Sequence, residues 1–297
     1  MPRSAVPAGV AGRYALVTRA RGSRSGERSA RDAGHSVEFL DYRPYQPGDE
    51  PRAVDWRAYA RSRRLYTRLY HAERAADVHL LLDTSPSMAL HGKDRWGRAV
   101  ARSLASLARH EASSRVHLLN GRSSGPSRGR ADAVALWRFI DAAPQLASEP
   151  GAPLATLLTR RVLALPSHPG AAAVVVISDL LDPAPLRPLL TAARARRVDL
   201  VVLQILAEDE RNPDSGRFEL VDVEDGSVVE VGPEEARAYR DALREFVARA
   251  RGEIIAAGQR HALLTAPAGA ADAATAPDLL ERLAFAELVR SGVVARR

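Results

Sequence analysis

The stretch from Val78 to Ser87, which reads Val-His-Leu-Leu-Leu-Asp-Thr-Ser-Pro-Ser, decides the fold. Its first five residues are mostly apolar and end at Asp83, which is typical of a short strand buried on both faces of a parallel sheet. A helix is predicted from about Asp94 to His110, because apolar residues recur there at helical spacing. A buried strand followed by a helix is the first unit of an alternating α/β pattern.

The same alternation continues along the chain. Strands are expected at residues 116–119, 173–177, 199–206 and 262–265, and helices at 131–142, 154–165, 186–196, 233–251 and 278–290. This pattern predicts a doubly wound α/β fold, with a mostly parallel sheet and helices on both of its faces. Residues 218–223 and 227–231 flank a Glu-Asp-Gly turn and predict a β-hairpin inserted into this plan.

Composition excludes several classes of protein. The chain has 297 residues, of which 46% are hydrophobic and 27% charged, so a sizeable core forms without disulfides or metals. It has no cysteine, which removes thiolate nucleophiles and cysteine-ligated metal centres. We find no targeting peptide and no apolar stretch of about 20 residues, so we expect a cytoplasmic protein without a membrane span.

Positive charge is concentrated near the N-terminus. Residues 1–77 carry 15 arginines against 9 acids, whereas residues 78–297 carry 28 basic residues against 27 acids. Residues 1–34, rich in Arg, Gly and Ser, are predicted to form a flexible, loosely ordered N-terminus. Residues 35–76 are predicted to form an irregular, partly β module, which precedes the α/β domain at 77–297.

Side chains that carry oxygen follow two of the predicted strands. Asp83, Ser85 and Ser87 come directly after the first strand and offer one carboxylate and two hydroxyls. Ser178 and Asp179 end a later strand in the same way. Ligands of open α/β sheets collect outside the carboxyl ends of the strands, and hard oxygen ligands suit Mg²⁺ or Mn²⁺. If the two strands are neighbours, Asp83 and Asp179 face each other across a divalent-metal site.

Each of these residues also has a structural interpretation. Asp83 and the two serines would form a capped turn between strand and helix, with their side chains bonded to backbone amides. Asp179 would act as the N-cap of a helix after its strand.

These motifs resemble those of a known family. The Asp-x-Ser-x-Ser string at 83–87, with Ser-Asp at 178–179, is similar to the metal-ion-dependent adhesion site of von Willebrand factor A domains. The upstream residues resemble the block that marks the family called domain of unknown function 58, namely Glu38, Phe39, Asp41, Tyr42, Arg43, Tyr45, Pro47, Gly48, Asp49, Arg52, Val54, Asp55 and Trp56. The resemblance runs from about residue 35 to beyond residue 265.

The resemblance implies a von Willebrand A-like fold and a noncatalytic role. Such members are similar in plan to bacterial proteins that accompany MoxR-type AAA+ ATPases, which implies an adaptor in the chaperone-like assembly or maturation of client proteins. The partner would be the ATPase, or a client whose acidic side chain completes the shell of the cation. Ala152 stands where the family carries a threonine that helps to hold the metal, so a metal-free scaffold is the alternative.

The upstream block has two interpretations. We expect Asp49, Arg52, Asp55 and Trp56 to form an internal ion-pair and packing cluster that fastens the N-terminal module to the sheet. Buried Arg and Asp usually pair, which favours this interpretation over a partner-binding surface.

Two other functions compete with the adaptor. Residues 121–125 satisfy the G-x-S-x-G pattern of serine hydrolases around Ser123, and Asp179 and His261 follow in the hydrolase order. The helix that this pattern requires is prevented by Gly125 and Pro126, so no enzyme is expected. The basic N-terminal region is compatible with nucleic-acid binding, but it lacks an aromatic platform and a reading helix.

Overall fold

A computed structural model of the chain describes most of its residues. The described residues are 12–19, 21–26, 38–47, 49, 54–75, 77–108, 112–144, 152–166, 172–213, 218–221, 228–269 and 277–297. The chain divides into two compact units, one formed by Arg21–Ala75 and the other by the rest. The larger unit carries the strands and motifs that predict the fold.

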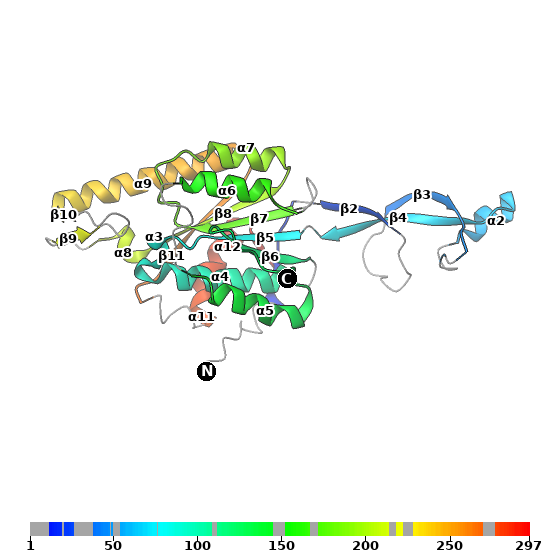
Figure 1. The fold of residues 1–297 in the computed structure, drawn as a ribbon, viewed down its shortest axis with the longest axis horizontal. Helices are drawn as coiled ribbons and strands as arrows, with labels where there is room; N and C mark the ends of the chain where they lie inside the picture. The colour runs from blue at the N-terminus through cyan, green and yellow to red at the C-terminus, as the bar shows by residue number, and fades with distance from the viewer. Residues whose placement is uncertain are drawn as a thin grey trace. The chain divides into compact units, whose positions relative to one another are not determined.

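The larger unit is built on a five-stranded sheet (Figure 1). Its strands, in spatial order, are β11 (Arg260–Ala266), β8 (Asp199–Ala207), β7 (Ala172–Ser178), β5 (Asp77–Leu82) and β6 (Ser114–Leu118). All neighbouring strands are parallel. The chain moves from β5 outward to β6 and then returns to the other side of β5, so the order reverses between β5 and β7. This arrangement confirms the predicted α/β class with a parallel sheet.

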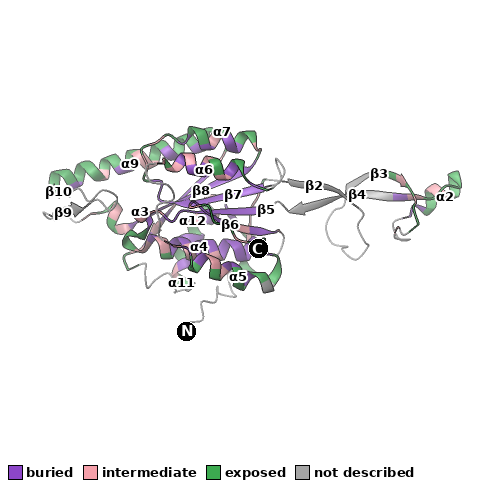
Figure 2. Ribbon diagram, viewed as in Figure 1, coloured by how far each residue is buried: buried purple, intermediate pink, exposed green. Residues whose placement is uncertain are grey.

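Alternate residues of the three inner strands β5, β7 and β8 enter two separate cores, whereas β6 and β11 contribute to the first core only. In β7, the odd-numbered residues from Ala173 to Ile177 pack into one core and the even-numbered residues from Ala172 to Val176 into the other. The first core is covered by α4 (Lys93–Ala108), α5 (Gly129–Asp141), α11 (Pro277–Leu280), η3 (Glu281–Phe285) and α12 (Ala286–Arg290). The second is covered by α6 (Leu154–Leu163), α7 (Arg187–Ala195) and α9 (Pro233–Ala256). β7 and β8 are buried throughout (Figure 2), which is why they are continuous apolar runs.

Helical spacing in α4 produces the buried face expected from the sequence. Trp96, Val100, Leu104 and Leu107 all lie in the core. In α9, by contrast, the helix continues past Gly252, its expected end, and stops at Ala256.

Among the described residues, no helix is long and apolar enough to cross a lipid bilayer.

Two segments near the ends of the chain, for which the sequence predicts no secondary structure, form strands that pair with each other. β1 (Tyr14–Leu16) lies antiparallel to β12 (Val294–Arg296). Tyr14 is buried, and its ring lies 5.0 Å from that of Phe285. Residues 14–16, which lie in the region 1–34 predicted to be flexible and loosely ordered, therefore form a strand of the larger unit.

Short elements connect the larger ones. After β5 the chain forms α3 (Pro86–Ala89) and η2 (Leu90–Gly92), and after β8 it forms α8 (Glu208–Arg211). β9 (Phe218–Val221) and β10 (Val228–Val231) then pair antiparallel with each other.

The described residues of the smaller unit form a three-stranded antiparallel sheet and one helix. Its strands are β2 (Arg21–Gly26), β4 (Tyr66–Ala75) and β3 (Glu38–Pro44), in that order, and its helix is α2 (Trp56–Ser62). The unit begins before residue 35, the boundary expected from the sequence, because β2 pairs with β4.

Candidate functional site

The candidate site lies where the order of the parallel strands reverses. β5 and β7 are neighbours, with Leu82 opposite Ile177 in the register. Asp83 therefore follows one strand beside Ser178 at the end of the other. In open α/β sheets ligands bind outside the carboxyl ends of the strands at such a reversal. The structure thus brings the two predicted acidic strand ends together.

Asp83 is buried and has a hydrogen-bond donor on each carboxylate oxygen. Its Oδ1 accepts the backbone N–H of Ser85 at 2.9 Å, and its Oδ2 accepts the Ser178 hydroxyl at 2.6 Å. Burial raises the pKa of Asp83 to about 6, and the negative charge of Asp179 also raises it. Both hydrogen bonds act in the opposite direction, because they favour the charged carboxylate. Asp83 thus combines the predicted turn-capping role with a position beside Asp179.

The two serines of the motif lie at the start of α3. The Ser85 and Ser87 hydroxyl oxygens are 3.0 Å apart, within hydrogen-bond distance. Both residues are partly exposed, whereas Met88 beside them is fully buried and anchors the short helix. The hydroxyls therefore face the rim of the site, and Asp83 lies beneath it.

Asp179 is bound by a lysine that belongs to none of the sequence motifs. Lys93, the first residue of α4, is fully buried, and its Nζ donates to Asp179 Oδ2 at 2.8 Å. The same Nζ donates to Glu210 of α8. The other oxygen of Asp179 accepts the backbone N–H of Leu181 at 3.2 Å. We call Asp83, Ser85, Ser87, Ser178, Asp179, Lys93 and Glu210 the strand-end cluster.

Further polar contacts attach the strand-end cluster to β8 and β11. The Gln204 side-chain amide donates to the backbone carbonyl of Asp179 at 3.0 Å, and its oxygen lies 3.1 Å from Nε2 of His261. Glu210 also accepts the backbone N–H of Ala207 at 2.8 Å. The cluster is therefore hydrogen-bonded to β8 directly and to β11 through Gln204.

Comparison with known proteins identifies the family. Residues 41–253 match the model described as "Protein of unknown function DUF58". The chain belongs to this family. Two solved structures are similar to this DUF58 chain, and in each case the sequence identity is 15%. One is an aerotolerance-related membrane protein from Bacteroides fragilis, with a TM-score of 0.36 over 58% of this chain and 97% of that one. The other is BatB from Bacteroides thetaiotaomicron, with a TM-score of 0.38 over 71% and 99%. No curated protein matches the chain.

The strand-end cluster of this DUF58 chain does not fit a divalent ion as its side chains are arranged. Both oxygens of Asp83 and both oxygens of Asp179 already accept hydrogen bonds, and the Ser85 and Ser87 hydroxyls bond each other. Ala152, before α6, has no side-chain oxygen to add. Among the described residues, no three His, Cys, Asp or Glu side chains group as metal ligands. An ion would first have to displace the Lys93 ammonium from Asp179.

Sequence reasoning finds five of the seven residues of the strand-end cluster and misses Lys93 and Glu210. Lys93 has one available signal, since it is the single lysine among 43 basic residues. Glu210 has none, because Glu208, Asp209 and Glu210 are adjacent acids and only the fold selects one of them.

The upstream DUF58 block is a hydrogen-bonded network within the smaller unit. Asp49 forms an ion pair with Arg43 at 2.8 Å and accepts the Thr67 hydroxyl at 2.9 Å. The backbone N–H of Gln46 and the Arg43 side chain lower the pKa of Asp49, because both favour its charged form.

The other residues of the expected cluster divide between capping and exposure. Asp55 is buried and caps α2, accepting the backbone N–H groups of Arg57 and Ala58 and the Tyr42 hydroxyl. Trp56 is 59% exposed, so it is not a packing residue of this network. Arg52 lies outside the described residues.

The hydrolase order Ser, Asp, His does not assemble. Ser123 lies 2.8 Å from Nδ1 of His117, whose Nε2 lies 2.9 Å from Nδ1 of His79. His261 bonds Gln204 instead, and Asp179 bonds Lys93. Burial lowers the pKa of His117 to about 3, far below the range in which an imidazole is an effective general base. The next helix, α5, begins only at Gly129.

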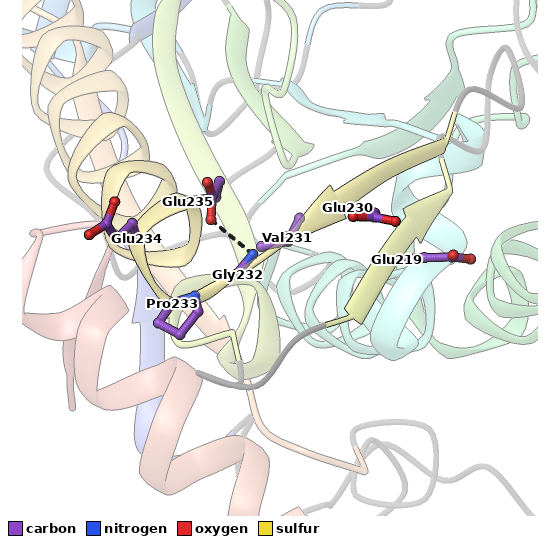
Figure 3. Close-up of a pocket in the computed structure, with 7 residues that line it drawn as sticks. All are labelled: Glu219, Glu230, Val231, Gly232, Pro233, Glu234 and Glu235. Carbon is purple, nitrogen blue, oxygen red and sulfur yellow. Dashed lines mark hydrogen bonds between the residues drawn. The ribbon is translucent and has the colours of Figure 1, made fainter.

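A hollow of about 610 Å³ lies beside the start of α9 (Figure 3). It is lined by Glu219, Glu230, Val231, Gly232, Pro233, Glu234 and Glu235. Glu235 turns back to accept the backbone N–H of Gly232 at 2.9 Å, which satisfies the helix terminus. No residue of the strand-end cluster lines this hollow. Its lining residues belong to the β9–β10 pair and to the start of α9.

Proposed function

We propose that this DUF58 chain is a noncatalytic adaptor that binds a partner protein at the carboxyl edge of its central sheet. The observation that carries the proposal is the strand-end cluster itself, placed where the strand order reverses. This position is the usual ligand site of such sheets, and its polar groups are fixed by buried hydrogen bonds rather than arranged around a reacting atom.

The finer form of the proposal follows from the family resemblance. The partner is a MoxR-type AAA+ ATPase or a client protein with an acidic side chain, and the process is chaperone-like assembly or maturation of that client. The β9–β10 pair acts as a hairpin inserted into the von Willebrand A-like plan, and the smaller unit acts as the N-terminal family module.

The rim of the site offers residues that can be changed without disturbing the core. Leu90 of η2 is 37% exposed, and Ser87 is partly exposed beside it. His91 and Asp209, both exposed, lie 3.3 Å apart and connect the segment after β5 to the segment after β8. A partner docked over the strand-end cluster would cover this rim.

The test is direct binding to a purified MoxR-type AAA+ ATPase by biolayer interferometry. Ser87→Arg and Leu90→Asp are expected to abolish binding, because they place a large or charged group on the rim. Val134→Asp on α5, where Val134 is 46% exposed, is the matched control and should bind normally. Equal binding by all three variants would show that the carboxyl edge is not the docking surface.

A further inference from the structure

The strand-end cluster contains the single lysine of the chain. All other 42 basic residues are arginine, yet Lys93 is the one whose side chain is fully buried against carboxylates at the carboxyl ends of the strands. Arginine is a planar fork, whereas the lysine ammonium is a compact point charge with three donors. In a chain that uses arginine almost everywhere, this position holds the compact cation.

The surroundings of Lys93 match those of a small cation bound to oxygen ligands. Its Nζ bonds Asp179 at 2.8 Å and also bonds Glu210, and both carboxylates are at least nine-tenths buried. Asp179 directly follows β7, Glu210 belongs to α8 just after β8, and the lysine is the first residue of α4. A buried charge is tolerated only when it is paired and hydrogen-bonded. Two carboxylates provide that pairing here.

We propose that the Lys93 ammonium is the resident cation of the strand-end cluster and takes the place of a divalent metal ion. Glu210 is then the carboxylate that this cation holds, in the position that an outside acidic side chain would occupy on an ion. The class of ligand is unchanged, since an ammonium and a divalent cation both attract carboxylates, but binding requires no metal. This inference does not rest on the adaptor proposal, because it concerns the unpartnered chain.

The single lysine allows a test on the unaltered protein. The full chain labelled with ¹⁵N-lysine has one side-chain ammonium, and a buried, hydrogen-bonded ammonium exchanges slowly enough with water to give a signal in a heteronuclear NMR spectrum. We expect one such signal at neutral pH, unchanged by Mg²⁺ and not broadened by paramagnetic Mn²⁺. Stoichiometric loss of the signal on adding Mn²⁺ would overturn the proposal, because the ion would then displace or adjoin the ammonium.

Variants test whether the ammonium and a metal ion are equivalent. Lys93→Met leaves Asp179 and Glu210 without a cation, so its melting temperature is expected to rise with added Mn²⁺ while that of the parent protein does not change. Asp241→Asn, which removes an exposed carboxylate from α9, should behave like the parent protein. If Lys93→Met folds and its melting temperature does not change with Mn²⁺, the ammonium and a metal ion are not equivalent at this site. If Lys93→Met does not fold, calorimetry of the parent protein decides, since Mn²⁺ binding that is lost in Asp83→Asn would contradict the proposal.

Discussion

The two ends of the parallel sheet each bury an ion pair, but with different cations. At the amino end, Nη2 of Arg260 lies 2.7 Å from Asp199 Oδ2. At the carboxyl end, Nζ of Lys93 lies 2.8 Å from Asp179 Oδ2 and also bonds Glu210. One strand connects the two ends, since β8 begins at Asp199 and stops just before α8.

The difference lies in what each cation holds besides its carboxylate. The Arg260 guanidinium also donates to the backbone carbonyls of Val17 and Gly292, and Asp199 accepts the backbone N–H of Arg19. The amino-end pair therefore fastens the terminal segments to the sheet. Among the described residues, the Lys93 ammonium bonds the side chains of Asp179 and Glu210 and no backbone carbonyl. This difference agrees with the proposal that the carboxyl end is the recognition site, whereas the amino-end pair stabilises the fold.

The largest effect is expected from breaking the amino-end pair. Arg260→Met leaves Asp199 buried without a counter-charge, and removing one partner of a buried pair costs about 3–5 kcal/mol. Urea unfolding followed by circular dichroism measures this loss. Arg290→Met is the matched control, because its pair with Glu287 is exposed and worth less than about 1 kcal/mol. Similar unfolding midpoints for the two variants would show that the amino-end ion pair does not stabilise the fold.

Exchanging the two cations is the next test of the comparison. Arg260→Lys keeps the charge beside Asp199 but loses the bonds to two carbonyls, a loss of about 1–2 kcal/mol at about 1 kcal/mol per hydrogen bond. Lys93→Arg forces a larger group into a fully buried site, and overpacking typically costs about 1–3 kcal/mol. We expect Lys93→Arg to be the more destabilised in the same urea experiment. The reverse order would mean that the carboxyl end accommodates a guanidinium and does not require a compact cation.

Sequence patterns predict the sheet well because its physics is local. The buried strands around Leu80 and Val175 are continuous apolar runs, and helical spacing from Trp96 to Leu107 fixes the face of α4. The β1–β12 pair escapes prediction because it joins Tyr14 to Arg296, and three-residue strands carry no periodicity. Similarly, no local pattern shows that β2 belongs to the smaller unit.

The sequence predicts those residues of the site whose positions follow from chain order and fold class. Asp83 and Asp179 are found because each ends a strand, and a parallel sheet brings such ends together. Lys93 and Glu210 are not found, since their contact spans 117 positions and depends on where α4 and α8 begin. Trp56 is placed wrongly in an internal packing cluster, because a family block shows which residues recur and not which are buried.

Acid should lower the folding stability through His261, which lies between the two ends of the sheet. His261 follows Arg260 in β11 and bonds Gln204, and burial lowers its pKa to about 4 from the ordinary 6.5. The folded state thus keeps the imidazole neutral while the unfolded state takes up a proton below pH 6.5. The stability that His261 provides is therefore complete above pH 6.5 and is lost as the pH falls toward 4. The loss is about 1.4 kcal/mol per pH unit, or about 2 kcal/mol at pH 5.

The variant His261→Gln isolates this contribution. Its amide can still donate to Gln204 but does not titrate. The stability it loses between pH 7.5 and pH 5, measured by urea unfolding, should be smaller than that of the parent protein by about 2 kcal/mol. Buried His79 and His117, whose pKa values are lowered to about 4 and about 3, and Asp83, whose pKa is raised to about 6, remain in both proteins, so their contributions cancel in the comparison. Identical pH profiles would show that His261 is not held neutral by the fold.

The smallest effect should come from neutralising Glu210, and it is the sharpest test of the difference between the ends. Glu210→Gln keeps an oxygen for the Ala207 N–H, and Lys93 still pairs with Asp179, so we expect a loss of about 1 kcal/mol. Asp199→Asn is the matched change at the other end, where Arg260 and the Arg19 N–H both depend on the same oxygen, and it should cost at least twice as much. If Glu210→Gln is as destabilising as Asp199→Asn, Glu210 is a structural clamp like Asp199. A small loss would instead leave Lys93 with a carboxylate that it can give up, as a site for an outside acidic side chain requires.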